Sequence, residues 1–241
     1  MSTYVLVHGA WHTGALFEAV AQPIRDAGHI VHCPTIRGNN PGDPRTTGLD
    51  AAIASIAEFL DSNDLDDVIL LGHSYGGMVI TGVADRVPNR IRRLIYWNAF
   101  VPNNGECLND MVPPHYVDLF DAVSSESPDN SVMLPFPIWR EAFINDGSAE
   151  LAQSSYDQLN AHPYATFTDP ISLSANPAEM QIGKSFINCT EDTALPQSLG
   201  WHPRLSEKLG LFRLVQIPGS HELCFTDPDA LAAAIMDAGR D

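Results

Sequence analysis

The sequence predicts an α/β fold in which a parallel sheet, flanked by helices, is interrupted by an inserted helical segment. Over residues 1–102 and again over residues 182–241, short apolar runs typical of strands alternate with longer stretches typical of helices. Residues 103–181 carry little strand pattern and are interrupted by prolines and aromatic residues. Around Ser74, a buried strand passes through a sharp, glycine-flanked turn into a helix.

Apolar runs and the residues at their ends predict the strands and helices of residues 1–102 and 182–241. The strands are predicted at residues 3–7, 29–32, 68–71, 91–96, 184–189 and 211–217. The helices are predicted at residues 13–27, 50–60, from 78 onward, and 228–239. Thr13 is the expected cap of the first helix, Gly28 ends it, and Pro23 inside it predicts a kink or a shorter helix. Prolines, glycines and asparagines predict a long loop over residues 34–48.

The middle of the chain predicts short helices and not a continuation of the sheet. Candidates are residues 114–122, 137–145 and 149–159, each begun or preceded by a proline or a polar residue. We therefore expect a core formed by residues 1–102 and 182–241, with a helical cap inserted at residues 103–181.

Composition and charge fit a globular α/β domain and exclude several classes of partner. The 241 residues are 44% hydrophobic and 18% charged, with a formal net charge of −17. Because no basic patch is available, neither nucleic acid nor an anionic membrane is an expected partner. The four cysteines are scattered without the spacing of a zinc site or a disulfide framework. A strand at the very start and the lack of a long apolar run predict a cytoplasmic protein.

The pattern Gly72-x-Ser74-x-Gly76 is typical of a serine nucleophile on a sharp turn. Such a turn strains the backbone of the serine and leaves no room for side chains on its close neighbours. The turn raises the Ser74 hydroxyl at the carboxyl end of a strand, with a helix N-terminus behind it. The alternative for this pattern is a tight turn without a chemical role.

A serine nucleophile needs a base, and the base needs an acceptor that fixes its tautomer. His221 follows the last strand and is the predicted base, while His8 and His73 are expected to be structural. Asp192 follows the preceding strand and is the predicted acid, with its neighbour Glu191 as the alternative.

Two backbone N–H groups are expected to bind the oxyanion, those of Ala10 and Tyr75. Ala10 lies in the loop after the first strand and Tyr75 directly follows the nucleophile. Trp11 and His12, next to Ala10, are expected to wall the pocket or to hold the loop in place.

Several segments occur in an order that resembles a known family. They are residues 7–12 (VHGAWH), 72–78 (GHSYGGM), 100–102 (FVP), 189–196 (CTEDTALP) and 218–221 (PGSH). Together they are similar to the methyl esterase and hydroxynitrile lyase branch of the α/β-hydrolase superfamily, including bacterial pyrethroid-hydrolysing carboxylesterases. The resemblance implies a six-stranded, mostly parallel sheet under a helical cap, and it implies the roles given above for Ser74, His221, Asp192, Ala10 and Tyr75.

Two departures from this branch favour ester hydrolysis over cyanohydrin cleavage. Its hydroxynitrile lyases carry a lysine directly after the catalytic histidine, where this chain has Glu222. They also favour a threonine in the first loop, where this chain has Gly9. We expect the Glu222 carboxylate to face solvent.

The inserted segment is rich in aromatic residues, which suggests an apolar or aromatic substrate pocket. The candidates for lining it are Trp11 in the first loop and His115, Tyr116 and Trp139 in the insertion. Any one aromatic of the insertion could instead belong to the insertion's own small core.

The sequence thus predicts a serine hydrolase that cleaves a small-to-medium apolar or aromatic carboxylic ester or lactone through an acyl-enzyme, without cofactor or metal. Three alternatives stay open: a cofactor-independent dioxygenase, hydroxynitrile-lyase-type chemistry, and a non-catalytic ligand receptor on the same fold. The sequence leaves open whether the protein forms a homodimer.

Overall fold

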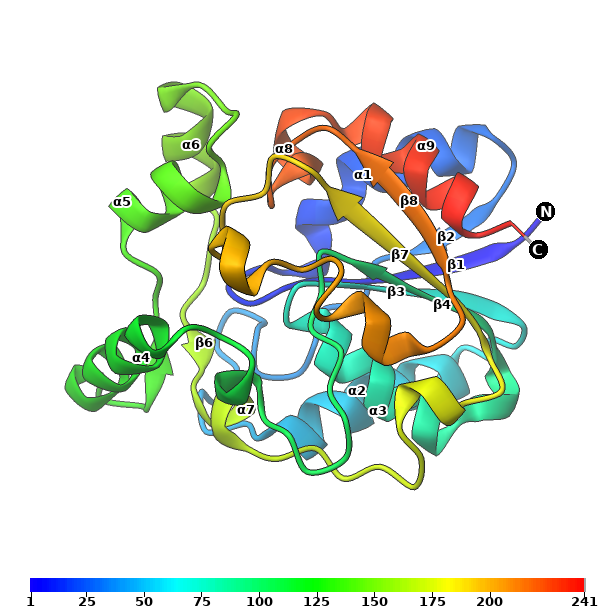
Figure 1. Ribbon diagram of the computed structural model, residues 1–241, viewed down its shortest axis with the longest axis horizontal. Coiled ribbons are helices and arrows are strands. Elements are labelled where there is room, and N and C mark those ends of the chain that lie inside the picture. Colours follow the sequence, from blue (N-terminus) through cyan, green and yellow to red (C-terminus); the bar gives the residue numbers. More distant parts are fainter. Residues whose placement is uncertain (241) are drawn as a thin grey trace.

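A six-stranded parallel sheet runs through the computed structural model, which describes residues 1–240 (Figure 1). The strands are β1 (Thr3–Val7), β2 (Ile30–His32), β3 (Val68–His73), β4 (Ile91–Trp97), β7 (Gly183–Cys189) and β8 (Arg213–Ile217). Their order across the sheet is β2-β1-β3-β4-β7-β8, and every neighbouring pair is parallel. The predicted α/β fold is confirmed, and β3, the strand that ends at the Ser74 turn, lies in the middle of the sheet.

Successive side chains of the strands point to opposite faces of the sheet and build two separate cores. In the neighbouring strands β1 and β3, one core contains Val5, Val7, Val68 and Leu70. Tyr4, Leu6, Ile69 and Leu71 belong to the other. The continuous apolar runs in the sequence therefore reflect strands that are covered on both sides.

Helices cover both faces. Helices α2 (Leu49–Ser62) and α3 (Gly76–Arg86) pack on one face, and α1 (Glu18–Asp26), α8 (Leu223–Thr226) and α9 (Pro228–Ala238) pack on the other (Figure 1). Short 3₁₀ turns occur at Gly14–Phe17, Pro88–Arg90, Leu108–Asp110, Pro177–Glu179, Gln197–Leu199 and Ser206–Leu209. The first helix, α1, begins at Glu18 and is shorter than the predicted residues 13–27, because a 3₁₀ turn precedes it. The prediction that Thr13 caps this helix is wrong, since the Thr13 side chain makes no capping hydrogen bond.

Between β4 and β7 the chain leaves the sheet. This inserted segment contains α4 (Pro114–Glu126), α5 (Phe136–Ile138), a π-helical turn (Trp139–Phe143), α6 (Ala149–Tyr156) and α7 (Ala165–Thr168). It also contains a small antiparallel pair, β5 (Ser131–Val132) and β6 (His162–Pro163), which the sequence did not predict because two residues are too few for an alternating pattern. Its apolar residues join the core on the α2 and α3 side of the sheet.

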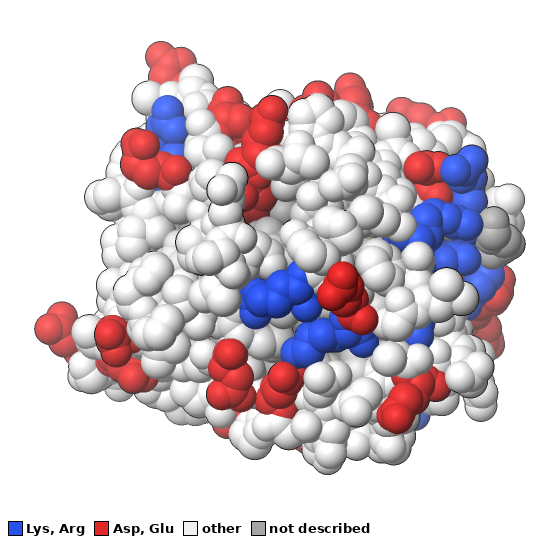
Figure 2. Space-filling model, viewed as in Figure 1, with Lys and Arg blue, Asp and Glu red and all other residues white. Residues whose placement is uncertain are grey.

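The surface carries the acidic excess in dispersed form. On the face drawn in Figure 2, acidic side chains occur all around the outline, and Lys and Arg gather in smaller groups near the centre and at the right-hand edge. Among residues 1–240, no helix is long and apolar enough to cross a membrane. The cytoplasmic location stays a prediction.

Candidate active site

Ser74 lies on the turn between β3 and α3 in a backbone conformation that serine rarely adopts. Its φ is 53°, in the left-handed region, and the residue is buried, with 8% of its surface exposed. Two hydrogen bonds fix the turn: the Ser74 N–H donates to the carbonyl of Trp97 (3.2 Å), and the Phe100 N–H donates to the carbonyl of Ser74 (3.1 Å). The end of β4 therefore holds the strained turn in place.

Three glycines let the backbones around Ser74 approach one another. A Cβ atom on Gly72 would lie 2.6 Å from the carbonyl oxygen of Gly76, and one on Gly76 would lie 2.7 Å from the carbonyl oxygen of His8. A Cβ atom on Gly77 would lie 2.1 Å from the carbonyl oxygen of Phe100. All these neighbours are backbone atoms. A side chain on Gly76 would therefore require the loop after β1 to move, one on Gly77 would require the loop after β4 to move, and one on Gly72 would require the turn itself to change.

His221 and Asp192 meet at the carboxyl ends of β8 and β7. His221 Nδ1 lies 2.7 Å from Asp192 Oδ2, and both side chains are 1% exposed. Since a carboxylate oxygen accepts, Nδ1 carries the proton and Nε2 is left as the basic nitrogen. Burial lowers the pKa of His221, whereas the charge and hydrogen bond of Asp192 and the charge of Glu222 raise it. The raising effects are together the larger, so the pKa of His221 lies above its ordinary value.

Asn98, which the sequence analysis did not single out, holds the Asp192 carboxylate. Its side-chain amide donates to Asp192 Oδ2, and its Oδ1 accepts from the Cys189 N–H at 2.7 Å. The other carboxylate oxygen, Oδ1, accepts from the Ala194 N–H at 2.8 Å. The one available signal in the sequence was a polar residue directly after an apolar strand, the strand that follows the Ser74 turn and its helix.

Glu191, the alternative acid, lies apart from His221. The residue is exposed, whereas the Asp192 side chain beside it is buried. Among residues 1–240, the hydrogen bonds of Glu191 involve its backbone: its N–H donates to the carbonyl of Gly219 (3.1 Å) and its carbonyl accepts from Asn145 Nδ2 (3.0 Å). The geometry thus separates two neighbours that the sequence left as alternatives.

Ala10 and Tyr75 offer free donors beside Ser74. Both residues line the same cavity as Ser74 and His221. Within residues 1–240, no hydrogen bond takes up the backbone N–H of either residue. Free N–H groups from the loop after β1 and from the start of α3 are what an oxyanion site requires.

His8 and His73 support the loops, as predicted. His8 Nδ1 donates to the carbonyl of Gly9 (2.8 Å) and its Nε2 accepts from the Ile36 N–H (3.0 Å), and burial lowers its pKa to about 3. His73 Nε2 donates to the carbonyl of His221 (3.0 Å), while its ring stacks on Trp97. Burial, and the nearby charge of His221, lower the pKa of His73 well below its ordinary value. Both rings are thus held by contacts with backbone groups, and burial disfavours their charged forms.

The expectation that Glu222 faces solvent is wrong. Its side chain is 1% exposed, and Oε2 lies 3.0 Å from His12 Nε2 and 3.7 Å from Cys224 Sγ. Glu222 directly precedes α8, and its carboxylate lies between side chains from the loop after β1 and from α8. No signal in the sequence distinguished this carboxylate from a surface one.

Two overlapping groups of buried side chains have the donor types of a metal site. They are His12 with Glu222 and Cys224, and His73 with His221 and Glu222, and within each group the ligand-type atoms lie within 4.8 Å of one another. Zinc accepts such nitrogen, oxygen and sulfur donors. In the first group, hydrogen bonds already join Glu222 to His12 and to Cys224. In the second group, His73 Nε2 donates to the backbone carbonyl of His221, and His221 Nδ1 donates to Asp192.

An aromatic pocket lies over Ser74. Its lining is almost entirely apolar and comprises Ala10, Trp11, Ser74, Tyr75, Phe100, Leu108, Val112, Tyr116, Phe120, Phe143, Phe167, Ala194, Leu195, Trp201 and His221. Water can occupy about 30 Å³ of it. That is room for roughly two or three molecules, so a larger ligand requires the side chains to move.

Of the four predicted pocket residues, Trp11 and Tyr116 line the cavity and two do not. His115 is exposed, because it lies on the outer side of α4, next to the inward-facing Tyr116. Trp139 is fully buried, and its indole N–H donates to the Ala152 carbonyl and the Ser155 hydroxyl, both at 3.2 Å. Assigning His115 and Trp139 to the pocket was therefore wrong.

Comparison with known proteins identifies the family. The model of the alpha/beta hydrolase family matches residues 4–234. A carbendazim-hydrolysing esterase from Nocardioides is 31% identical, covering 99% of this chain and 100% of its own length, and a pyrethroid hydrolase from Sphingobium wenxiniae is 27% identical over 97% and 86%. A solved extracellular α/β-hydrolase from a Paenibacillus species, described as sharing structural and functional homology with tobacco salicylic acid-binding protein 2, is 35% identical with a TM-score of 0.96 over both whole chains. The chain therefore belongs to the α/β-hydrolase family.

Proposed function

We propose that the protein is a serine hydrolase that cleaves small-to-medium apolar or aromatic carboxylic esters or lactones through an acyl-enzyme. The observation that carries the proposal is the 2.7 Å contact between His221 Nδ1 and Asp192 Oδ2, at the wall of the pocket that also exposes Ser74. The relatives named as a carbendazim-hydrolysing esterase and a pyrethroid hydrolase support ester hydrolysis as the type of reaction.

In the proposed reaction, Ser74 Oγ attacks the ester carbonyl carbon and its proton passes to His221 Nε2. The carboxylate of Asp192 stabilises the resulting imidazolium, in keeping with the raised pKa of His221. The leaving alcohol takes the proton from Nε2. Water then attacks the acyl-enzyme, His221 takes its proton, and the acid product leaves as Ser74 Oγ regains a proton.

The free N–H groups of Ala10 and Tyr75 are suited to hold the oxygen of each tetrahedral intermediate. Donors already in place at a buried site stabilise the developing charge without reorganising. Gly9 supports this role, because a Cβ atom there would lie 3.0 Å from His73 Nδ1 and 3.1 Å from Ser74 Cβ. The crowding also argues against threonine at this position, and with it against hydroxynitrile-lyase-type chemistry.

We assign substrate selection to the inserted segment, residues 103–181, acting as a cap over Ser74. It contributes Leu108, Val112, Tyr116, Phe120, Phe143 and Phe167 to the pocket. These side chains offer apolar and aromatic contact area, and no charged side chain lines the cavity described. An uncharged acyl or aromatic group therefore fits the pocket better than a charged one.

The direct test of the proposal is Ser74→Ala. This variant should lose labelling by a serine-reactive phosphonate and most ester turnover, by roughly a thousandfold or more, because the nucleophile is gone. Circular dichroism and the midpoint of urea unfolding should show that it remains folded. Wild-type hydrolysis by the alanine variant would refute the serine mechanism and favour a reaction driven by His221 and Asp192 alone.

A second comparison tests the acid. Asp192→Asn should reduce kcat by orders of magnitude, roughly ten-thousandfold for a comparable triad, because the amide no longer enforces the tautomer of His221. Glu191→Gln, the matched neighbour, should leave steady-state kinetics nearly unchanged because its side chain is exposed. The reverse pattern would transfer the acid role to Glu191.

Neighbouring residues of α4 test the role of the cap. Tyr116→Ala should lower kcat/KM for a bulky aromatic ester by roughly tenfold to a hundredfold, since apolar contact is lost, and should leave an acetyl ester almost unaffected. His115→Ala, on the exposed side of the same helix, should change neither value. An equal loss of kcat/KM for both esters in Tyr116→Ala would mean that the inserted segment supports the site without discriminating between substrates.

A further inference from the structure

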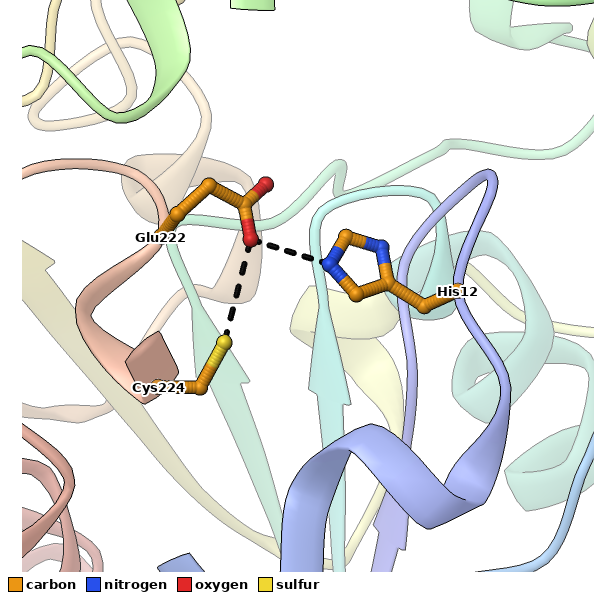
Figure 3. Close-up of side chains that lie close together, drawn as sticks. All are labelled: His12, Glu222 and Cys224. Atoms are coloured by element: carbon orange, nitrogen blue, oxygen red, sulfur yellow. Dashed lines mark hydrogen bonds and ion pairs between the residues drawn. The ribbon is translucent and has the colours of Figure 1, made fainter. Parts of the chain in front are cut away.

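A buried pair of polar side chains joins the two loops that carry the proposed oxyanion donor and the proposed base. His12 and Glu222 are each 1% exposed, and their Nε2 and Oε2 atoms lie 3.0 Å apart. His12 comes from the loop after β1, two residues beyond Ala10, and Glu222 directly follows His221 after β8 (Figure 3). Two segments separated by 210 positions in the chain are thus connected.

Hydrogen bonds at both nitrogens fix the ring of His12. Its Nδ1 lies 2.7 Å from the carbonyl oxygen of Ala10, and since a carbonyl can only accept, Nδ1 carries a proton. Its Nε2 must then either donate to the Glu222 carboxylate as part of an imidazolium or accept a proton from a Glu222 carboxylic acid. In both forms one proton lies between Nε2 and Oε2, and the pair as a whole is uncharged.

Burial makes this contact consequential. A charge or a polar group that loses its partner inside the protein costs several kcal/mol or a change of protonation state. The Cys224 thiol faces the same Oε2 at 3.7 Å (Figure 3). The Glu222 N–H donates to Ser220 Oγ at 3.2 Å, which holds the backbone of Glu222 in place. The pair therefore constrains the ring of His12, and through it the carbonyl of Ala10.

We propose that Glu222 is a positioning residue that, through His12, holds the Ala10 donor of the oxyanion site at a fixed place relative to His221. The inference rests on the proposed ester hydrolysis and adds to it a residue that touches neither the substrate nor the reacting atoms. Because the pair acts on the donor for the oxyanion, its loss affects the tetrahedral intermediate more than the bound ester.

Two substitutions at one position separate the hydrogen bond from the charge. Glu222→Gln keeps a donor to His12 Nε2, with a second N–H that can face Cys224 Sγ, but it removes the carboxylate. Glu222→Met keeps a similar volume and removes the bond. Cys224→Ala is the control for packing, because it removes a contact of the same oxygen from α8 without touching either loop.

Kinetics with an ester and inhibition by a trifluoromethyl ketone, which forms a tetrahedral adduct with a serine, provide the readout. Glu222→Met should lower kcat by roughly tenfold to a hundredfold and weaken ketone binding by a similar factor, with KM changed little. Glu222→Gln and Cys224→Ala should retain most of both, and urea unfolding should confirm that all three variants are folded. The proposal is overturned if Glu222→Met retains its kcat, if the loss appears only in KM, or if Glu222→Gln is as impaired as Glu222→Met.

A second measurement does not depend on esterase activity. In ¹⁵N-histidine-labelled wild-type protein, Nδ1 of His12 should be protonated, as its bond to the Ala10 carbonyl requires. An unprotonated Nδ1 would refute the arrangement. If the wild-type protein hydrolyses no ester and takes up no phosphonate, the proposed function fails while this spectrum still reports on the pair.

Discussion

Close approach of three backbone segments around Ser74 is the constraint on which the site depends. The turn after β3 lies against the loops that follow β1 and β4, with no space for a Cβ atom at Gly72, Gly76 or Gly77. Because the loops are this close, Ala10 from the first loop, Tyr75 from the turn and Asn98 from the third all come within one region. A single added methyl group at Gly77 would have to displace the carbonyl of Phe100, 2.1 Å away.

Asp192, His221 and His73 are buried side chains of this region, and hydrogen bonds connect them to neighbouring groups. Asn98 and the Ala194 N–H hold Asp192, which in turn orients His221. His73 binds the carbonyl of His221. In a low-dielectric interior, such contacts are stronger than in water and leaving one unmade is costly. The arrangement therefore keeps the donors and acceptors in place before a substrate arrives.

Much of the fold was predictable because its signals are local. The apolar runs of β1, β3, β4 and β7 and the glycine-flanked turn indicate a buried parallel sheet and a sharp strand-to-helix junction without reference to distant residues. The chain order of the segments that carry Ser74, Asp192 and His221, the proposed nucleophile, acid and base, followed from the same pattern. The predictions that His115 and Trp139 line the pocket, made from side-chain type alone, were wrong. Which side chains of the inserted segment point into the pocket depends on how its helices pack, and the local sequence does not show that packing.

The features of the site that could not be predicted from the sequence depend on contacts between segments that are distant in the chain. Asn98 and Asp192 are 94 positions apart, and His12 and Glu222 are 210 positions apart. Nothing local in the chain marks Glu222 as buried, since a glutamate is usually exposed. Likewise, the choice between Glu191 and Asp192 required the backbone direction after β7, which only the folded sheet supplies.

The central claim is that Ser74 becomes acylated. The most direct measurement is rapid mixing with a nitrophenyl ester, quenching in acid at a series of times, and peptide mapping by mass spectrometry. We predict an early release of nitrophenol together with a peptide that contains Ser74 and has gained the mass of the acyl group. Steady hydrolysis with that peptide unmodified at every time, or an acyl group on another residue, would contradict the account.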